Sequence, residues 1–243
     1  MIKSPFVMRM KKQKVAIVTA GSKGIGAACA RHLASEGYKL VMMSRSDSLF
    51  ALCDQLDARP IQGSMKDGND IVRLVDFTFE KYGRIDAVVC NTGHANKGPL
   101  FSLTDSDWEE GVNLLLMNVV RLARLVGPIM VKQKVGALVN ISTFGAKEPY
   151  LSFPISSVIR AAVSNYCKLF ASELGHANVR MNNILPGFIN SYPANEQTIN
   201  QIPMLRQGTP TEVAELASFL VSDKASYITG QDFVIDGGLT KSI

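Results

Sequence analysis

Three closely spaced glycines form a pattern that binds phosphate groups. They are Gly21, Gly24 and Gly26 in the stretch TAGSKGIG, residues 19–26, directly after the apolar run KVAIVTA. A strand, a glycine turn and a helix in this order bring backbone N–H groups and the positive end of the helix dipole to one point. Such a point holds the diphosphate of a dinucleotide. The sequence therefore predicts a dinucleotide site that also contains Ser22, Lys23 and Ile25.

The residues after the second apolar run, YKLVMMS, bear on the choice between NAD and NADP. An acid at this place would bind the ribose hydroxyls of NAD and repel a 2′-phosphate. The sequence instead has Ser44 followed by Arg45, and Lys23 of the glycine loop is expected nearby. Because two cations and a hydroxyl suit a phosphate, the sequence favours NADP(H) over NAD(H). The alternative is that both cations are solvated surface groups.

Other kinds of chemistry lack their sequence patterns. Ser156 and Ser157 have no G-x-S-x-G elbow and no paired His and Asp, so they do not predict a hydrolase. The three histidines are isolated and predict no metal site. Widely spaced cysteines predict reduced, mostly buried thiols and no disulfide framework. These are Cys29, Cys53, Cys90 and Cys167.

Apolar runs alternate with helical patterns along most of the chain. The runs KVAIVTA, YKLVMMS, RIDAVVCN, GALVNIS and VRMNNILP are separated by segments with helical periodicity, such as GIGAACARHLASEG. Buried strands that are linked by helices form parallel sheets. We therefore expect an α/β fold with a single Rossmann-type doubly wound parallel sheet and helices on both faces. Ligands of such sheets bind beyond the carboxyl ends of the strands.

Length and charge favour one globular domain. A chain of 243 residues with 47% hydrophobic and 19% charged residues fits a single α/β domain, expected at residues 13–243. The net charge of +5 arises in the first fourteen residues, and the rest of the chain is neutral. A basic tail at residues 1–12 on a neutral body does not predict nucleic-acid binding. No run resembles a secretory signal or is long enough to span a bilayer, so we expect a cytoplasmic protein without a membrane partner.

Four motifs resemble those of the short-chain dehydrogenase/reductase family, in the same order and at the same spacing, over nearly the whole chain. TAGSKGIG is similar to the family's TGxxxGxG, with Ala20 at its first glycine. CNTG, residues 90–93, is similar to its NNAG motif. LPGFI, residues 185–189, resembles the PG segment beside the nicotinamide, and YITGQDFVIDGG, residues 227–238, resembles the C-terminal strand and turn.

The resemblance implies a nicotinamide cofactor and an oxidoreductase that acts on a carbonyl or hydroxyl group. It also implies a homo-dimer or homo-tetramer that pairs the long apolar helices at 108–131 and 155–175. Burial within one subunit is the alternative explanation of that apolar pattern. Beyond the glycine loop, Ser44 and Arg45, the positions implied for the cofactor are Asn91, Gly93, Arg160, Pro186, Gly187, Ile189 and Ser191.

The positions that carry catalysis in the resembling family depart from its pattern. The family uses a Ser, a Tyr thirteen residues later, a Lys four residues after the Tyr, and an Asn on the preceding helix. Without gaps these positions fall on Thr143, Ser156, Arg160 and Leu115. A lysine one helical turn from a phenol lowers the pKa of the phenol so that it can move a proton. Ser156 is shorter and a far weaker acid, and Arg160 keeps its charge but does not exchange protons.

Other groups close to these positions are candidate proton donors. His94 directly follows CNTG, and an imidazole titrates near neutral pH. Tyr150 and Lys147 lie in the loop after GALVNIS. The alternatives are an ordinary loop histidine for His94 and a packing or lid residue for Tyr150. Residues 190–207 are expected to form a lid, whose mixed polarity does not identify the substrate.

Three hypotheses on function remain open at this point. The first is an NADP(H)-dependent oxidoreductase with an altered proton path, in which Thr143 and Arg160 polarise a carbonyl and water or His94 supplies the proton. The second is a catalytically silent NADP(H)-binding protein that acts as a sensor or structural subunit. The third is a non-redox enzyme that uses the same cleft. The first is favoured by analogy with the family.

Overall fold

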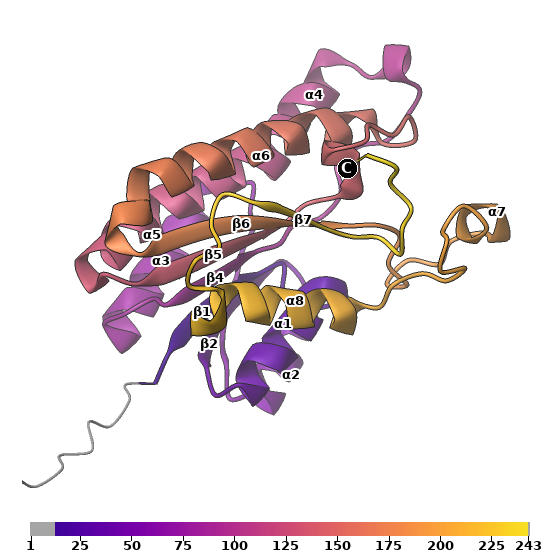
Figure 1. Cartoon of the computed structure of the whole chain (residues 1–243). Coiled ribbons are helices and arrows are strands. Elements are labelled where there is room, and N and C mark those ends of the chain that lie inside the picture. The colour runs from indigo at the N-terminus through magenta and orange to yellow at the C-terminus, as the bar shows by residue number, and fades with distance from the viewer. Residues whose placement is uncertain (1–12, 243) are drawn as a thin grey trace, which may run out of the picture.

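The computed structural model describes residues 13–242, so the basic tail expected at residues 1–12 lies outside the described residues. Seven strands form one parallel sheet in the order β3-β2-β1-β4-β5-β6-β7 (Figure 1). The predicted doubly wound α/β fold is confirmed. The strands are β1 (Val15–Thr19), β2 (Lys39–Ser44), β3 (Arg59–Gln62), β4 (Ala87–Cys90), β5 (Gly136–Ile141), β6 (Val179–Pro186) and β7 (Asp232–Ile235).

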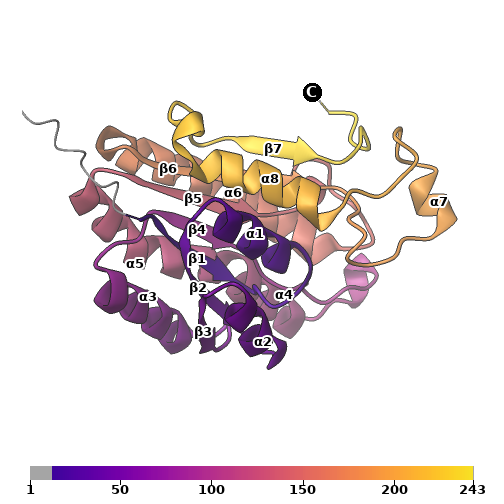
Figure 2. The same ribbon diagram turned by 90° about the horizontal axis from the view of Figure 1, so that it is seen from below.

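Helices cover both faces of the sheet, with α1, α2 and α8 on one face and α3, α5 and α6 on the other (Figures 1 and 2). Successive side chains of a strand point to opposite faces, so Val18 packs in the cluster of α1 and α8 while Ile17 packs in that of α3, α5 and α6. The helices are α1 (Gly24–Ser35), α2 (Ser48–Gln55), α3 (Gly68–Tyr82), α4 (Asp105–Gly111), α5 (Asn118–Gln133), α6 (Pro154–Leu174), α7 (Glu196–Ile199) and α8 (Pro210–Val221).

The strand order reverses between β1 and β4. The chain runs outward from β1 through β2 to β3, then returns to place β4 on the other side of β1. Connections on either side of this point leave in opposite directions and open a crevice at the carboxyl ends of the strands. Thr19 at the end of β1 and Asn91 just after β4 therefore face the same crevice.

The long apolar helix expected at 108–131 is interrupted in the structure. Helix α4 ends at Gly111, a π-helical turn labelled η2 spans Val112–Met117, and α5 begins at Asn118. A π-helical turn inserts an extra residue into the helical ladder and is frequent at functional sites. This turn contains Leu115, at the position where the resembling family has an asparagine.

Helices α3, α7 and α8 and strand β3 are not among the elements that the apolar-run pattern predicted. Strand β3 lies at the sheet edge and buries only Ile61, so its sequence carries little apolar signal. Helix α3 begins where the side chain of Asp67 accepts a hydrogen bond from the N–H of Asn69. Helix α8 begins with a capping box between Thr209 and Glu212.

One helical stretch, Asp105–Gln133, is long and apolar enough to cross a membrane by length and composition. The expectation that no run reaches that length was therefore wrong. In the fold, Leu122, Val126 and Met130 of this stretch are buried in the cluster that covers the sheet. Core helices of globular domains pass the same test, so the stretch is explained by burial against the sheet.

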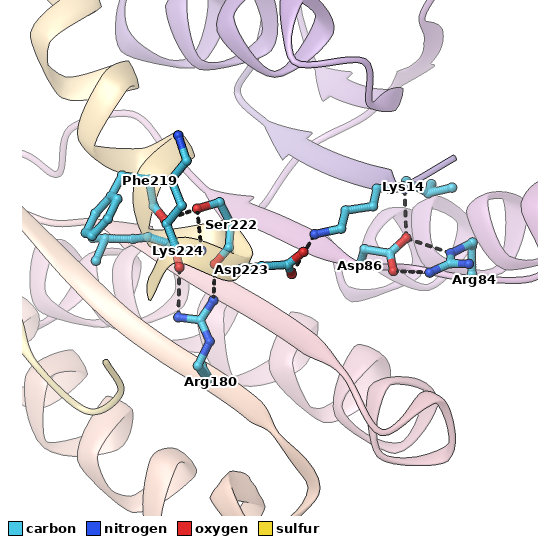
Figure 3. Close-up of polar contacts among 10 residues, drawn as sticks. Lys14, Arg84, Asp86, Arg180, Phe219, Ser222, Asp223 and Lys224 are labelled. Atoms are coloured by element: carbon cyan, nitrogen blue, oxygen red, sulfur yellow. Dashed lines mark hydrogen bonds and ion pairs between the residues drawn. The ribbon is translucent and has the colours of Figure 1, made fainter. Parts of the chain in front are cut away.

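Arg180 of β6 joins the sheet to the end of α8 (Figure 3). Its guanidinium donates hydrogen bonds to the carbonyl oxygens of Leu220 at 2.9 Å, Ser222 at 3.0 Å and Ile228 at 3.1 Å. The last carbonyls of a helix lack partners within the helix, and a cation there is favoured by the helix dipole. Burial lowers the pKa of Arg180, but the charge remains at neutral pH.

A second polar group closes the amino ends of β1 and β4 (Figure 3). The carboxylate of Asp86 accepts hydrogen bonds from the Val15 N–H at 2.8 Å and from the guanidinium of Arg84. Lys14 pairs with Asp223 at 2.7 Å. These contacts lie at the amino ends of the strands, whereas the crevice lies at the carboxyl ends. They therefore support the fold and leave the crevice free.

Candidate functional site

The glycine loop between β1 and α1 has the shape of a phosphate cradle. Gly24 has a φ of +55°, a left-handed conformation that other residues adopt only with strain. A Cβ on Gly26 would lie 2.8 Å from the side-chain nitrogen of Asn91, so the turn leaves no room for a side chain there. Lys23 caps α1 without a side-chain hydrogen bond, and the first turn of α1 contains no acid. The amides of this turn are therefore not used by side chains and suit an anion.

Asn91 holds the glycine loop against β4. Its side-chain nitrogen donates to the carbonyl of Ala20 at 3.3 Å, and its backbone N–H donates to the hydroxyl of Thr19 at 2.9 Å. The same hydroxyl donates to the Asn91 carbonyl at 2.7 Å. A Cβ on Gly93, two residues further on, would meet nothing within 4 Å. Asn91 thus shapes the cradle, while Gly93 borders open space in the crevice.

The residues expected to choose between NADP and NAD lie together beside the cradle. The hydroxyls of Ser22 and Ser44 are 2.9 Å apart, which joins the glycine loop to the end of β2. Arg45 and Lys23 are exposed, and neither side chain pairs with a carboxylate in the described part of the chain. Two cations next to two hydroxyls fit a 2′-phosphate, and within residues 13–242 no carboxylate forms an ion pair with either cation.

The segment after β6 reaches the cradle from the other side. A Cβ on Gly187 would lie 2.7 Å from Cβ of Asp236, so the PG turn packs tightly against the end of β7. Ile189 forms an isolated bridge with Gly208, which closes the base of the predicted lid. A Cβ on Gly24 would lie 3.4 Å from the Cβ of Ser191, so Ser191 is in van der Waals range of the glycine loop. The predicted cofactor positions of the two loops are therefore adjacent.

The segment predicted as a lid also contacts His94. The rings of His94 and Tyr192 are 5.1 Å apart in an edge-to-face arrangement. The backbone of Tyr192 is held by Gln207, whose side chain donates to its carbonyl at 2.9 Å. Partial desolvation and the charges of Lys97 and Arg160 lower the pKa of His94 below its ordinary value. Tyr192 was missed by the sequence analysis, and its only signal was an aromatic residue directly after Ser191.

The three positions that resemble a catalytic set converge at the end of β5. Thr143 follows β5 and accepts a weak hydrogen bond from the Gly145 N–H at 3.5 Å. Ser156 is half-buried in the first turn of α6, and no residue in the described range 13–242 forms a hydrogen bond with its hydroxyl. Arg160, one helical turn further, is 5% exposed and donates from Nη1 to the carbonyl of Ile141 at 2.5 Å. Burial lowers the pKa of Arg160 to about 10.

Leu115 lies in an apolar cluster beside this group. It is 1% exposed and packs in the same cluster as Ala95 and with Ile155 and Ile159 of α6. An amide at this position would bring a polar group to α6, whereas leucine excludes water from it. A water-based relay from η2 to α6 therefore has no polar anchor at Leu115.

Tyr150 belongs to an aromatic cluster and not to the open crevice. Its ring lies 5.1 Å from that of Phe153, 5.6 Å from Phe144 and 6.1 Å from Phe188. Its backbone N–H donates to the hydroxyl of Ser157 at 3.1 Å. These contacts favour the packing interpretation of Tyr150. Lys147 is exposed in the same loop.

The cysteines and potential metal ligands add no further chemistry. All four cysteines are free and buried, and burial raises the pKa of Cys29, Cys90 and Cys167. Within residues 13–242, no group of three or more His, Cys, Asp or Glu side chains is placed to hold a metal ion. The cradle and the end of β5 therefore form the candidate site.

Known proteins with related sequences are reductases. Residues 19–240 match the family described as enoyl-(acyl carrier protein) reductase. The chain is 34% identical over 239 residues to a 3-oxoacyl-[acyl-carrier-protein] reductase, FabG, from Thermotoga maritima, with 93% of this chain and 97% of the relative covered. It is 32% identical over 238 residues to a 3-oxoacyl-[acyl-carrier-protein] reductase from Synechocystis, covering 93% and 96%.

A solved structure agrees with the fold over almost the whole chain. The crystal structure of YwfH, an NADPH-dependent reductase involved in bacilysin biosynthesis, superposes with a TM-score of 0.90 at 28% identity. The match covers 95% of this chain and 100% of YwfH.

Proposed function

The chain belongs to the short-chain dehydrogenase/reductase family of oxidoreductases, and we propose that it is an NADP(H)-dependent reductase of a carbonyl compound with a non-standard proton path. The observation that carries the proposal is the cradle at Gly24 with two unpaired cations, Lys23 and Arg45, beside it. The NADPH dependence of YwfH supports the choice of cofactor.

The cofactor residues follow from the positions of the loops. In this proposal the amides around Gly24 hold the diphosphate, and Arg45 with the hydroxyls of Ser22 and Ser44 holds the 2′-phosphate. Ser191 closes over the diphosphate from the lid side. When bound, NADPH supplies the hydride that reduces the carbonyl carbon.

The residues at the end of β5 bind and polarise the substrate carbonyl. Thr143 donates a hydrogen bond to the carbonyl oxygen, and the cation of Arg160 stabilises the negative charge that develops on it. Ser156 is too short and too weak an acid to replace a tyrosine. The proton therefore comes from water or from His94, an exposed residue whose ring contacts that of Tyr192 in the predicted lid segment.

A catalytically silent NADP(H)-binding protein is the competing proposal. It is supported by Ser156 and Leu115, which leave α6 without a phenol and without a polar anchor from the preceding helix. Both proposals predict cofactor binding, and only the first predicts turnover. Binding and turnover therefore have to be measured on the same preparation.

The first experiment is an NADPH fluorescence titration followed by NADPH oxidation against ketones, aldehydes and acyl thioesters. The reductase proposal predicts oxidation with at least one carbonyl class. Tight binding without oxidation of any substrate in the panel would favour the silent protein. No binding of NADPH or NADH would reject both.

A double variant tests the proton path directly. Ser156→Tyr with Arg160→Lys restores the phenol and lysine of the resembling family. A rise in kcat of about 100-fold would show that the usual relay is missing, since general acid catalysis contributes about 10²–10⁴-fold. An unchanged kcat would indicate that the pocket works by another route. The two single variants are the matched controls.

Assembly and location follow from the same family membership. We propose a homo-dimer or homo-tetramer that pairs α5 and α6, and two apolar residues of α6, Val158 and Leu169, are 54% and 70% exposed. We also propose that the protein works in the cytoplasm, where free thiols stay reduced.

A further inference from the structure

Arg160 is a buried cation without a buried anion. It is 5% exposed, and no carboxylate of residues 13–242 forms an ion pair with it. A single hydrogen bond, from Nη1 to the carbonyl of Ile141, offsets its burial. Burying a guanidinium is unfavourable unless an anion or several acceptors surround it. The protein therefore tolerates an unfavourable charge at this position.

Two hydroxyls in the same region are also enclosed and unpaired. In the described part of the chain, the buried side-chain atoms without a hydrogen bond are Oγ1 of Thr92, Oγ of Ser142 and Nε of Arg160. Cys90 of β4 pairs with Asn140 of β5, so continuing this register by two residues brings Thr92 level with Ser142. The bond of Arg160 to Ile141 puts the guanidinium next to Ser142. All three atoms thus lie at the ends of β4 and β5.

One missing partner would explain all three unpaired atoms. Native proteins pair nearly all their buried polar groups, so three exceptions in one place need a cause. Two hydroxyls and a guanidinium N–H are donors, and the charge of Arg160 favours a negative acceptor. Nη2 of Arg160 forms no hydrogen bond with residues 13–242 and is not among the enclosed unpaired atoms. Nη2 and Nε lie on the same edge of the guanidinium, and a ligand can reach this edge through Nη2.

We propose that Arg160, Ser142 and Thr92 bind a carboxylate of the substrate, close to the carbonyl that is reduced. The proposal rests on the proposed function, because it places this carboxylate in the same cleft, and it changes one role there: Arg160 binds the carboxylate, and the hydroxyl of Thr143 polarises the carbonyl. A planar guanidinium donates two parallel hydrogen bonds to a carboxylate. The remaining lone pairs of the carboxylate oxygens can then accept hydrogen bonds from the hydroxyls of Ser142 and Thr92. The substrate class is then a small oxo acid, unlike the acyl-carrier thioesters named for the relatives.

Calorimetric titration of sodium formate into the full-length protein tests the site. The titration is made at constant ionic strength, without cofactor and with saturating NADP⁺. We expect saturable binding in both conditions, at least tenfold weaker in Arg160→Gln and several-fold weaker in Ser142→Ala and Thr92→Val. Lys97→Gln is the matched control, because it removes a nearby cation outside the cluster and should leave the affinity unchanged.

Four results would overturn the proposal. They are no saturable binding by the wild type, equal binding by Arg160→Gln, an equal loss in Lys97→Gln, and formate binding that NADP⁺ abolishes. An equal loss of affinity in Lys97→Gln would indicate that formate responds to the overall positive charge of the region and not to the cluster of three side chains. The fourth would assign Arg160 to the cofactor.

Thermal unfolding gives a second readout that a structural role would not produce. If Arg160 is kept for a ligand, Arg160→Met removes an uncompensated charge, and the Tm of the ligand-free protein rises by roughly 2–4 °C. Formate should then raise the Tm of the wild type and not that of the variant. If the bond to Ile141 is the main role of Arg160, the Tm of Arg160→Met falls instead, and the proposal is wrong.

Failure of this proposal can be distinguished from failure of the reductase proposal. Formate binding is measured without turnover, so a protein that binds formate but oxidises no NADPH loses only the reductase proposal. A protein that reduces neutral ketones or thioesters and does not bind formate loses only the carboxylate site.

Discussion

At the residue scale, the proposed preference for NADP(H) rests on Arg45. It is exposed, follows the Ser44 hydroxyl and pairs with no carboxylate in residues 13–242. Arg45→Asp would replace a phosphate-binding cation with an acid that repels phosphate and accepts from ribose hydroxyls. We expect the Kd for NADPH to rise at least tenfold relative to the Kd for NADH, measured by fluorescence titration.

Arg31→Asp is the control for this change in charge, because Arg31 lies on α1 and contacts Gln55. It should change the two dissociation constants little and equally. An unchanged NADPH to NADH ratio in Arg45→Asp would remove Arg45 from the phosphate site.

His94 belongs to the same scale, because its pKa decides when it can donate a proton. Desolvation and the charges of Lys97 and Arg160 hold this pKa below the ordinary value of 6.5. The imidazole is therefore mainly neutral at pH 7, and its acid form increases as the pH falls toward this lowered pKa. If His94 supplies the proton, kcat for carbonyl reduction rises as the pH falls through the lowered pKa.

The variant His94→Gln should flatten this rise and reduce kcat by about tenfold or more. Saturating NADPH and substrate separate the effect on kcat from effects on binding. A pH profile of the same shape in the variant would assign the proton to water.

At the element scale, the cradle depends on how β1, α1 and β4 approach one another. Gly26 has no room for a Cβ, because Asn91 reaches across it to the carbonyl of Ala20. In Gly26→Ala the methyl group would separate the loop from β4 and displace the amides that are proposed to hold the diphosphate. We expect a loss of NADPH affinity of at least tenfold with a retained circular dichroism spectrum.

Gly175→Ala is the matched control at this scale. A Cβ on Gly175 would meet nothing within 4 Å, and its φ is not positive. Its NADPH affinity should equal that of the wild type. Equal affinities in both variants would show that the cradle does not hold the cofactor.

At the scale of the whole molecule, the two ends of the strands serve different purposes. The carboxyl ends hold unpaired cations and hydroxyls, whereas the amino ends hold the hydrogen-bonded groups of Arg180 and Asp86 (Figure 3). Strained or unpaired groups concentrate where a protein binds ligands, and they are offset by well-paired groups elsewhere. The pattern supports the proposal that ligands bind at the carboxyl ends of the strands, and it indicates that the groups at the amino ends contribute to stability.

Arg180→Met tests this division through global stability. The change leaves the carbonyls of Leu220, Ser222 and Ile228 without their donor, which costs about 2–5 kcal/mol in the free energy of unfolding. Urea denaturation measures it. Arg31→Met, at an exposed arginine, should change the free energy by less than about 0.5 kcal/mol. Equal effects of the two variants would contradict the role of Arg180.

The sequence by itself determined the fold class and the cradle, because both depend on local signals. Apolar runs that are buried on both faces predict parallel strands, and the glycines at 21, 24 and 26 identify the turn that follows the first strand. Strand β3 and the π-helical turn at Val112–Met117 escaped this reasoning, since one buried residue or one extra residue in a helix leaves no periodic signal.

Only the tertiary structure decided which distant residues meet. The contact of Tyr192 with His94, the approach of Ser191 to Gly24, and the burial of Arg160 beside Ser142 each join segments that are far apart in the sequence. Whether a charge is paired or buried depends on all the elements packed around it, and residue types and spacing do not specify that surrounding. The sequence therefore shows that position 160 is an arginine, but only the fold shows that this arginine is buried and that no carboxylate of residues 13–242 pairs with it.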